Sequence, residues 1–338
     1  MSSDNHHSGT DCSSIPDHPG LKNCAEELRA LYRPSIRLLA TPVEDDLPAG
    51  VSKLGGRPDL PDGVDWPTTQ IICPRPSEGF LKAHPNERRL PEDGRIHLSF
   101  VGQINLKEIQ PFDVRSQLPN SGLLSFFYNP QVFASDTNTG SSSGIQDHIT
   151  GYRYDLFGWD NLANWQVLFT DSDPSELRRR EFPNTLYEAI QYKSNRLAFR
   201  VENCLPSLET SYFPRPESED GHIRLTQEEW ETYRTLRYDL RANIGIHQML
   251  GYADQWAATT DEESYWRWRD HLFPELPPEE ALSTAERNTE AASIRLLLQV
   301  NTFDDTAEWW GRGGTLYFFI RECDLRARNF SKVWGEVE

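Results

Sequence analysis

Apolar residues follow two periods along the chain, one typical of strands and one typical of helices. Runs that alternate or stay apolar, rich in aromatic and β-branched residues, predict strands at residues 35–41, 96–105, 122–128, 148–155, 165–171, 294–301, 313–321 and 333–337. Apolar residues three and four positions apart predict helices at residues 20–32, 226–243 and 261–273. Residues 173–198 are expected to be helical in parts, and residues 246–255 to form a turn. This mixture indicates an α+β fold with mixed sheets and peripheral helices.

The helix predicted over residues 226–243 carries the clearest start signal in the chain. Thr226 is a natural N-cap residue, and Glu229 follows it three positions later. This spacing is that of a capping box, in which each of the two side chains bonds the backbone N–H of the other residue. We therefore expect the helix to begin directly after Thr226.

Short matches recur between the two halves of the chain. They pair Gly55 with Gly251, Gln103 with Gln299, and Gly122 with Gly314. The first two pairs are both 196 residues apart and the third is 192 residues apart. Equal spacing of unlike residues predicts an internal duplication. We expect two related halves, 33–200 and 201–338, whose apolar sheet faces share one core.

The segments before residue 33 are expected to stand outside this plan. Residues 1–19 are rich in Ser, Asp and His and predict a disordered tail, and residues 20–32 predict an N-terminal helix. The tail has neither the cationic nor the apolar region of a signal peptide, and no run approaches the ~18 apolar residues of a membrane helix. We expect a cytoplasmic protein that does not bind membranes.

Net charge narrows the class of partner. Among 338 residues, 52 are acidic and 34 are basic, so the formal net charge is −18. Nucleic-acid binding requires clustered Lys and Arg, which makes a nucleic-acid partner unexpected. An acidic surface suits a soluble protein or one that meets a basic partner. The five cysteines are scattered without a CxxC pair, so neither a disulfide framework nor a zinc site is expected.

Several segments carry a family resemblance. In order they are SKLGGRPDLP from residue 52, LSFVGQINL from 98, LPNSGLLSFF from 118, HQMLGY from 247, LLLQV from 296 and WGRGGTLYFFIRECDLRARNFSKVW from 310. Together they resemble the YwqG family, also called DUF1963. The resemblance implies an α+β fold with an internal duplication, and it implies little chemistry, because the family has no established activity. Members are often bacterial and cytosolic, and some are associated with polymorphic-toxin systems as immunity-like proteins.

No motif in the chain predicts catalysis, a metal site or a cofactor. The segment KLGGRPDLP resembles a glycine-rich phosphate loop, but Lys53 precedes the glycines, and Pro58 and Pro61 prevent the helix that such a loop requires. We therefore interpret it as a rigid turn. His97 and His247 have no Cys or His at metal-ligand spacing. There is no GxSxG motif and no cysteine with a recognisable base.

Four amides stand at matched strand ends and mark a candidate cleft. Gln103 and Asn105 share one strand face, as do Gln299 and Asn301, because alternate residues of a strand point the same way. They could line a polar cleft between the halves. The alternative, which we favour, is that they bond the backbone of neighbouring loops, as most buried amides do.

Residues 254–290 form an acidic insertion with ten acidic residues against three arginines. Its predicted helix contains both acidic and aromatic residues, a combination that is common in protein-binding surfaces. The residues predicted to bind a partner are Asp261, Glu262, Glu263, Trp266 and Trp268. The alternative is a solvated structural helix.

The function predicted from the sequence is that of a protein-binding module without enzymatic activity. Its more specific form is an immunity protein that binds a basic toxin domain and covers its active site. The alternative is an enzyme or small-ligand-binding protein that uses a cleft between the two halves. A deep cleft with converging polar groups would favour this alternative.

Overall fold

The computed structural model describes residues 12–44, 47–70, 93–129, 162–186, 190–208, 223–242, 247–254, 260–301 and 315–337. Strands and helices are both present, which confirms the α+β class. The strand expected at 148–155, and Gly314 of the third predicted match, lie outside the described residues.

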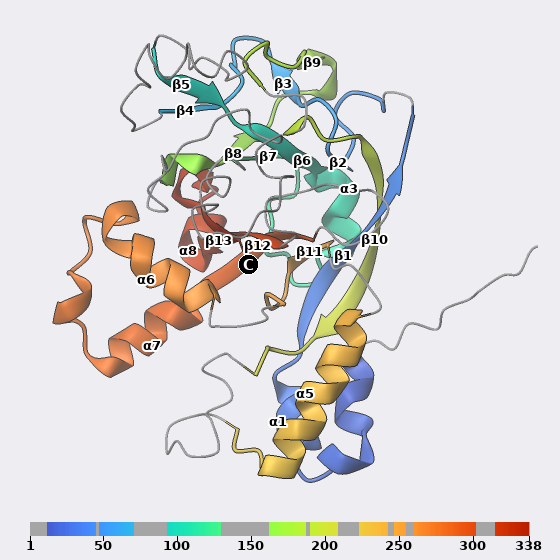
Figure 1. Ribbon diagram of the computed structural model, residues 1–338, viewed down its shortest axis with the longest axis vertical. Helices are drawn as coiled ribbons and strands as arrows, with labels where there is room; N and C mark the ends of the chain where they lie inside the picture. Colours follow the sequence, from blue (N-terminus) through green and yellow to red (C-terminus); the bar gives the residue numbers. More distant parts are fainter. Residues whose placement is uncertain are drawn as a thin grey trace, which may run out of the picture.

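One ten-stranded sheet forms the body of the protein and curves until it is nearly closed into a barrel (Figure 1). Its order is β14-β13-β12-β11-β1-β10-β2-β6-β7-β8. The strands are β1 (Arg33–Pro42), β2 (Lys53–Leu54), β6 (Ser99–Asn105), β7 (Leu123–Tyr128), β8 (Trp165–Thr170), β10 (Asn195–Cys204), β11 (His247–Leu250), β12 (Ile294–Asn301), β13 (Thr315–Arg321) and β14 (Trp334–Val337).

Two small sheets and several short helices surround this body. The small sheets pair β3 (Asp59–Pro61) with β9 (Leu177–Arg179), and β4 (Thr68–Gln70) with β5 (Arg95–His97). The α-helices used below are α1 (Ala25–Ala30), α3 (Leu106–Ile109), α5 (Gln227–Ala242), α6 (Thr260–Leu272), α7 (Thr284–Ala292) and α8 (Glu322–Arg326). The expectation of mixed sheets is wrong for the described strands, which all pair antiparallel.

The large sheet has four strands on each side of a central pair, and on each side they follow one another in chain order from the centre to the edge. We call β2, β6, β7 and β8 the first arm, and β11, β12, β13 and β14 the second arm; β1 and β10 pair along their full length between the arms. The β6–β7 and β12–β13 pairs each contain one register shift, at Val101 in the first and at Leu297 in the second. Both pairs therefore bend at a matching place.

A pair of left-handed residues follows β2 and recurs at the end of β11. Gly55 and Gly56 have φ values of 64° and 73°, and Leu250 and Gly251 have φ values of 61° and 72°. Gly56 and Gly251 are thus each the second residue of such a pair, whereas the match made from sequence pairs Gly55 with Gly251. Leu250 is unusual, because a branched side chain rarely adopts this backbone conformation.

Both arms contribute to one apolar core. Phe126 of β7 and Phe318 of β13 meet edge to face with their ring centroids 5.1 Å apart. Trp165 closes the seam between the outermost strands, because its indole ring lies 5.3 Å from that of Phe318 and covers Gly335. A Cβ atom at Gly335 would come within 2.0 Å of that indole, so only glycine fits there.

The outer face of the second arm is covered by α6. Tyr317, Phe319 and Trp334 of the sheet pack there with Tyr265 and Phe273 of the acidic insertion. Trp334 also donates a hydrogen bond to the Ser264 hydroxyl at 3.0 Å. The helix predicted at 261–273 is thus present, and it is bound to the body through aromatic contacts.

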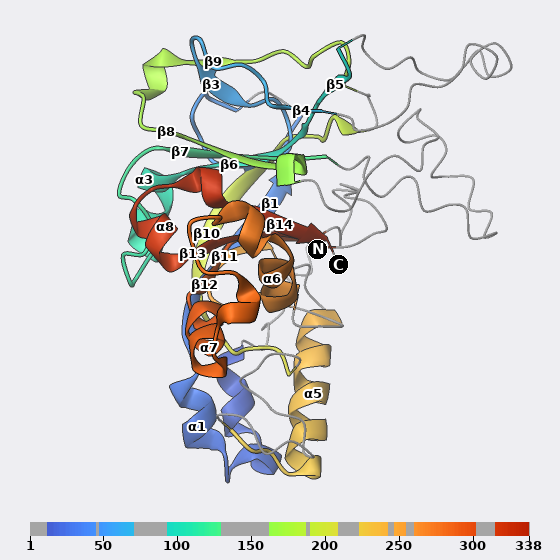
Figure 2. The same ribbon diagram turned by 90° about the vertical axis from the view of Figure 1, so that its left-hand side faces the viewer.

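A separate apolar cluster joins the start of the chain to α5, at the end of the molecule away from the small sheets (Figures 1 and 2). It contains Ile15, Leu21, Leu28 and Tyr233. The prediction of a disordered tail over residues 1–19 is therefore wrong for its last part. Residues 12–17 form a 3-10 helix, and Ile15 within it is 2% exposed, so its packing in this cluster holds the segment in place. Residues 1–11 lie outside the described part.

The capping box predicted for α5 is present. The Glu229 amide donates to the Thr226 hydroxyl at 3.2 Å, and the Thr226 amide donates to the Glu229 carboxylate at 2.9 Å. These bonds satisfy two N–H groups that a helix start leaves without partners. None of the helices in the described part of the chain is long and apolar enough to cross a membrane.

Two other expectations are corrected by the sheet. Residues 173–198, expected to be helical in parts, hold one 3-10 helix at Pro174–Glu176, but they also hold β9 and the start of β10; residues 247–250 form β11 where a turn was expected. β9 pairs with β3, while β10 and β11 both pair with β1, so ladder hydrogen bonds with a neighbouring strand override local preference in each case. The boundary predicted at residue 200 falls inside β10.

Candidate functional site

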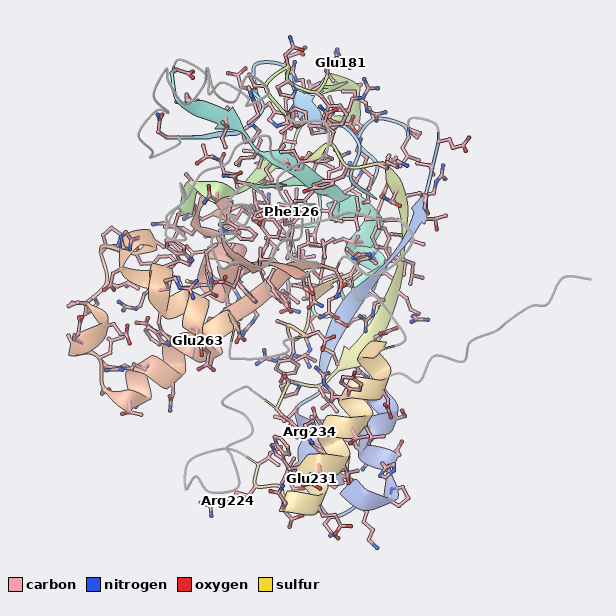
Figure 3. The ribbon with its side chains drawn as sticks, in the orientation of Figure 1. Phe126, Glu181, Arg224, Glu231, Arg234 and Glu263 are labelled. Atoms are coloured by element: carbon pink, nitrogen blue, oxygen red, sulfur yellow. The ribbon has the colours of Figure 1, made fainter. Side chains whose placement is uncertain are left out.

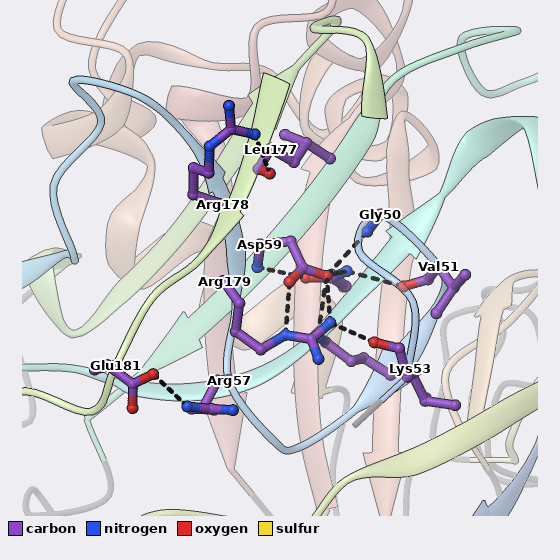
Figure 4. Close-up of polar contacts among 11 residues, drawn as sticks. Gly50, Val51, Lys53, Arg57, Asp59, Leu177, Arg178, Arg179 and Glu181 are labelled. Atoms are coloured by element: carbon purple, nitrogen blue, oxygen red, sulfur yellow. Dashed lines mark hydrogen bonds and ion pairs between the residues drawn. The ribbon is translucent and has the colours of Figure 1, made fainter. Parts of the chain in front are cut away.

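A buried carboxylate between the first arm and β9 accepts several hydrogen bonds and ion pairs (Figure 4). Asp59 of β3 has no exposed surface. Its oxygens accept hydrogen bonds from the Lys53 ammonium at 3.0 Å, from the Gly50 amide at 3.0 Å and from Arg179 Nε at 2.9 Å. Gln103 donates to the same carboxylate at 2.7 Å and accepts the Asp59 amide at 3.0 Å.

The ionised state of Asp59 follows from these neighbours. Burial opposes its ionisation, but the hydrogen bond from Arg179 and the charge of Lys53 outweigh burial and lower the Asp59 pKa. Both oxygens already accept hydrogen bonds, and neither is exposed. The cluster therefore ties the turn at 50–61 to β6 and β9. Lys53 faces Asp59 in this turn, consistent with our reading of KLGGRPDLP as a rigid turn.

The four predicted cleft amides bond to neighbouring loops and strands. Gln103 Nε2 donates to the Val51 carbonyl at 2.8 Å, and Gln299 Oε1 accepts the Asp254 amide at 2.9 Å. These two contact sets share no residue. Asn105 Nδ2 donates to the Gly50 carbonyl at 2.7 Å, and Asn301 Nδ2 donates to the Thr315 hydroxyl at 2.9 Å. A cleft between the halves stays a prediction.

The two glutamines occupy matching environments. Gln103 accepts the amide of Asp59, and Gln299 accepts the amide of Asp254. Each aspartate is paired with an arginine: Arg179 lies 2.9 Å from Asp59, and Arg237 lies 2.8 Å from Asp254. Each arm is thus bonded to a Gln–Asp–Arg chain in which the glutamine and the aspartate are buried and the arginine is half-buried.

The residues predicted to bind a partner are distributed between the surface and the core. Glu263 is exposed on α6 (Figure 3), while Asp261, Glu262 and Trp266 are half-buried. Trp266 stacks edge to face on Tyr265 at 5.0 Å. Trp268 is 3% exposed and belongs to the apolar cluster beneath α6, where its indole N–H has no hydrogen-bond partner. The surface part of the set is therefore Asp261, Glu262, Glu263 and Trp266.

An ion pair holds α7 against α6. All nine residues of α7 are described and none is buried. Arg269, whose side chain is fully buried, donates to both oxygens of Glu290 at 2.6 and 2.8 Å. Tyr265 adds a hydroxyl hydrogen bond to Glu290 at 2.7 Å. The bond from Arg269 outweighs partial burial and lowers the Glu290 pKa, so this link is charged at neutral pH.

Replacing Glu290 by Gln is expected to loosen α7 while the sheet stays folded. The change removes the charge opposite a buried guanidinium, which costs about 2 kcal/mol. Hydrogen exchange should become faster in residues 284–292, and urea denaturation should show the loss of stability. Glu280→Gln, at an exposed position of the same insertion, is the matched control. Unchanged exchange in α7 would show that the pair does not hold it.

Sequence reasoning missed both charged centres. Asp59 and Arg179 are 120 residues apart, so no local pattern links them. A usable signal was present in KLGGRPDLP, where Lys53 and Asp59 flank a turn between buried strands. Charges in such a position are almost always paired.

Comparison with protein families identifies a match over most of the chain. A family model described as "Domain of unknown function (DUF1963)" matches residues 52–338. Among curated proteins, none matches the chain.

Proposed function

The chain belongs to the DUF1963 family, and from the surface of its acidic insertion we propose that it is a protein-binding module for a basic protein partner. In the more specific form of this proposal it is a cytoplasmic immunity protein, which neutralises a toxin by covering the toxin's active site. The observation that carries the proposal is the hairpin formed by α6 and α7, which extends from the side of the sheet (Figure 1).

The α7 half of the hairpin is ordered although none of its residues is buried. Ion pairs and the capping box of Ser283 and Glu286 keep α7 in place without apolar burial. A nine-residue helix that buries nothing of its own contributes little to the core. Its retention in a fixed position suits a role in recognition.

Charge supports a basic partner. Residues 254–290 carry ten acidic residues and three arginines, about two fifths of the net charge of −18. Arg267 and Arg269 are both paired with carboxylates, at 2.6 Å each. The hairpin thus presents a negative field, which speeds encounter with a positive surface and weakens over the ~8 Å Debye length of physiological salt. A toxin that acts on phosphate-bearing substrates has such a surface.

Trp266 offers the aromatic anchor that such an interface needs. It is half-buried beside the exposed Glu263, and the Arg269 guanidinium lies 5.8 Å from its ring. An aromatic side chain already fixed by neighbours loses little entropy on binding. Trp268 supports this surface from beneath, since it is packed in the core.

Reversing the charge of Asp261, Glu262 and Glu263 to Lys is expected to slow association with the partner about tenfold or more at low salt. Trp266→Ala should weaken binding by about 2 kcal/mol through faster dissociation. The partner is first captured from native lysate and identified by mass spectrometry, then purified for surface plasmon resonance and for an assay of its own activity.

The matched control reverses three acids of α5, Glu228, Glu231 and Asp239, which gives the same change in net charge at a distant site (Figure 3). The proposal requires that this control bind the partner like wild type and that bound protein inhibit the partner. Equal binding by the α6 variant and the control would reject the hairpin as the interface. Binding without inhibition would reject the immunity role.

We also propose that the two arms arose by duplication of one unit. The palindromic strand order, the register shifts at Val101 and Leu297, and the matching Gln–Asp–Arg chains support a common origin. When the first and second halves of many family sequences are aligned with each other, Gln103 should align with Gln299, and Gly56 with Gly251. A different register would contradict the proposal.

A further inference from the structure

Three arginines share the outer face of the β1–β10 pair, in a chain whose net charge is −18. Arg196 and Arg200 are exposed on β10, and Arg37 of β1 lies directly opposite Arg200. They share a face because alternate residues of a strand, and opposed residues of a strand pair, point to the same side. The inner face of β1 holds Ile36 and Leu38, which belong to the core. We call Arg37, Arg196 and Arg200 the arginine stripe.

The stripe carries more positive charge than its own acidic neighbour balances. Glu202 pairs with Arg37 through one carboxylate oxygen and with Arg200 through the other. Three arginines and one glutamate give a charge of 3 − 1 = +2. Arg37 is 7% exposed, and its Nη1 nitrogen is buried without a hydrogen-bond partner. Since like charges opposed across a strand pair are destabilising, this face gains from additional carboxylates.

Leu39 gives the same face an apolar point between the two exposed arginines. It lies opposite Ala198, which is midway between Arg196 and Arg200 along β10. Its side chain is 42% exposed. Diagonal neighbours in a strand pair are about 7–8 Å apart, so one segment of a partner can contact Leu39 and both arginines.

We propose that the arginine stripe binds the α6–α7 hairpin of a second copy of this chain. The hairpin has the complementary pattern, because the acidic residues 261–263 stand beside the half-buried Trp266. Its carboxylates pair with the arginines, and its indole contacts Leu39. Guanidinium groups are also attracted to the face of a tryptophan ring. This inference rests on the proposed function in that both use the same surface of the hairpin.

The positions of the two surfaces determine how copies associate. The β1–β10 pair and the hairpin lie on opposite sides of the body (Figure 1), so the contact joins separate chains head to tail. At physiological ionic strength charges act over ~8 Å. The facing patches therefore attract each other, although two chains of net charge −18 repel at longer range. Association covers the hairpin, so a basic partner must displace the second copy before it binds.

Analytical ultracentrifugation of the full chain tests the proposal. At protein concentrations up to ~1 mM, a contact with Kd on the order of 1 mM is still detected. Wild type should associate reversibly in ~0.15 M NaCl and should be monomeric in ~1 M NaCl, where the screening length is about 3 Å. Arg196→Gln with Arg200→Gln, the stripe variant, should weaken association about tenfold. The control, Arg224→Gln with Arg234→Gln, makes the same change in net charge at exposed positions near α5 (Figure 3) and should associate like wild type.

Mixing two variants tests which surfaces meet. The stripe variant keeps its hairpin, and the hairpin variant, Asp261→Asn with Glu262→Gln and Glu263→Gln, keeps its stripe. Each alone should associate about tenfold more weakly than wild type, and an equal mixture should form a dimer that grows no further, because only one intact contact remains. If the stripe variant does not fold, Arg196→Gln alone, at an exposed position, takes its place.

Three outcomes would overturn the proposal: a monomeric wild type in ~0.15 M NaCl, association that neither variant weakens, and a mixture that stays monomeric. The stripe variant also separates this inference from the proposed function. With its hairpin intact, it should bind the basic partner at least as tightly as wild type. A monomeric wild type that binds the partner would leave the proposed function standing, whereas self-association without partner binding would leave only the contact between copies.

Discussion

Asp59→Asn is expected to destabilise the protein by about 3–5 kcal/mol, one of the largest effects of any single polar substitution in this chain. The change leaves the buried Lys53 ammonium and the Arg179 guanidinium without their shared counter-charge. A buried pair contributes little net stability while intact, but a single buried charge without a partner is costly. Urea denaturation measures the loss, with Asp62→Asn on the exposed side of the same turn as control.

Acid titration gives a second readout of the same cluster. The folded-state pKa of Asp59 is lowered, so its contribution to stability is complete above the unfolded pKa of about 3.9 and is lost as pH falls towards the folded pKa. Wild-type stability should therefore fall more steeply with acid in this range than that of Asp59→Asn. A loss below about 1 kcal/mol at pH 7, with parallel acid limbs, would contradict this account of the cluster.

Local pattern predicted most of the strands, because each strand is an apolar run bounded by turn residues. The run at 294–301 became β12, and the run at 122–128 became β7 with a difference of one residue. The same reasoning failed where partners decide the structure. β11 is four residues long, and it exists because β1 and β12 pair with its two edges. Nothing within residues 247–250 contains that information.

In the candidate sites, too, features set by local sequence were predicted, and features set by contacts with distant segments were not. The acidic insertion was recognised from composition, since charge and aromatic content are local properties of a segment. Which face of α6 is buried was not predicted, and this depends on the sheet residues Tyr317, Phe319 and Trp334 that lie beneath it. The pairing of Asp59 with Arg179 depends in turn on the antiparallel register of β3 and β9. Contacts between segments more than a hundred residues apart follow from topology and not from local pattern.

Phe126→Ala and Phe318→Ala are each expected to destabilise the protein by about 3–5 kcal/mol, since both rings have no exposed surface and their removal leaves a cavity. The two changes should not be additive. The rings meet edge to face at 5.1 Å, so the double variant should lose about 1 kcal/mol less than the sum of the single losses. Urea denaturation of the four proteins measures this coupling.

The coupling tests whether the two arms are energetically one body. Phe126 belongs to the first arm and Phe318 to the second (Figure 3 labels Phe126), and the barrel interior is where these arms meet. Phe273 serves as control, because it lies in the cluster beneath α6 and not in the barrel interior. Phe126→Ala and Phe273→Ala should therefore add within about 0.5 kcal/mol. Additive losses for the Phe126 and Phe318 pair would mean that each arm is stabilised by itself, and that the shared core contributes little to holding the two arms together.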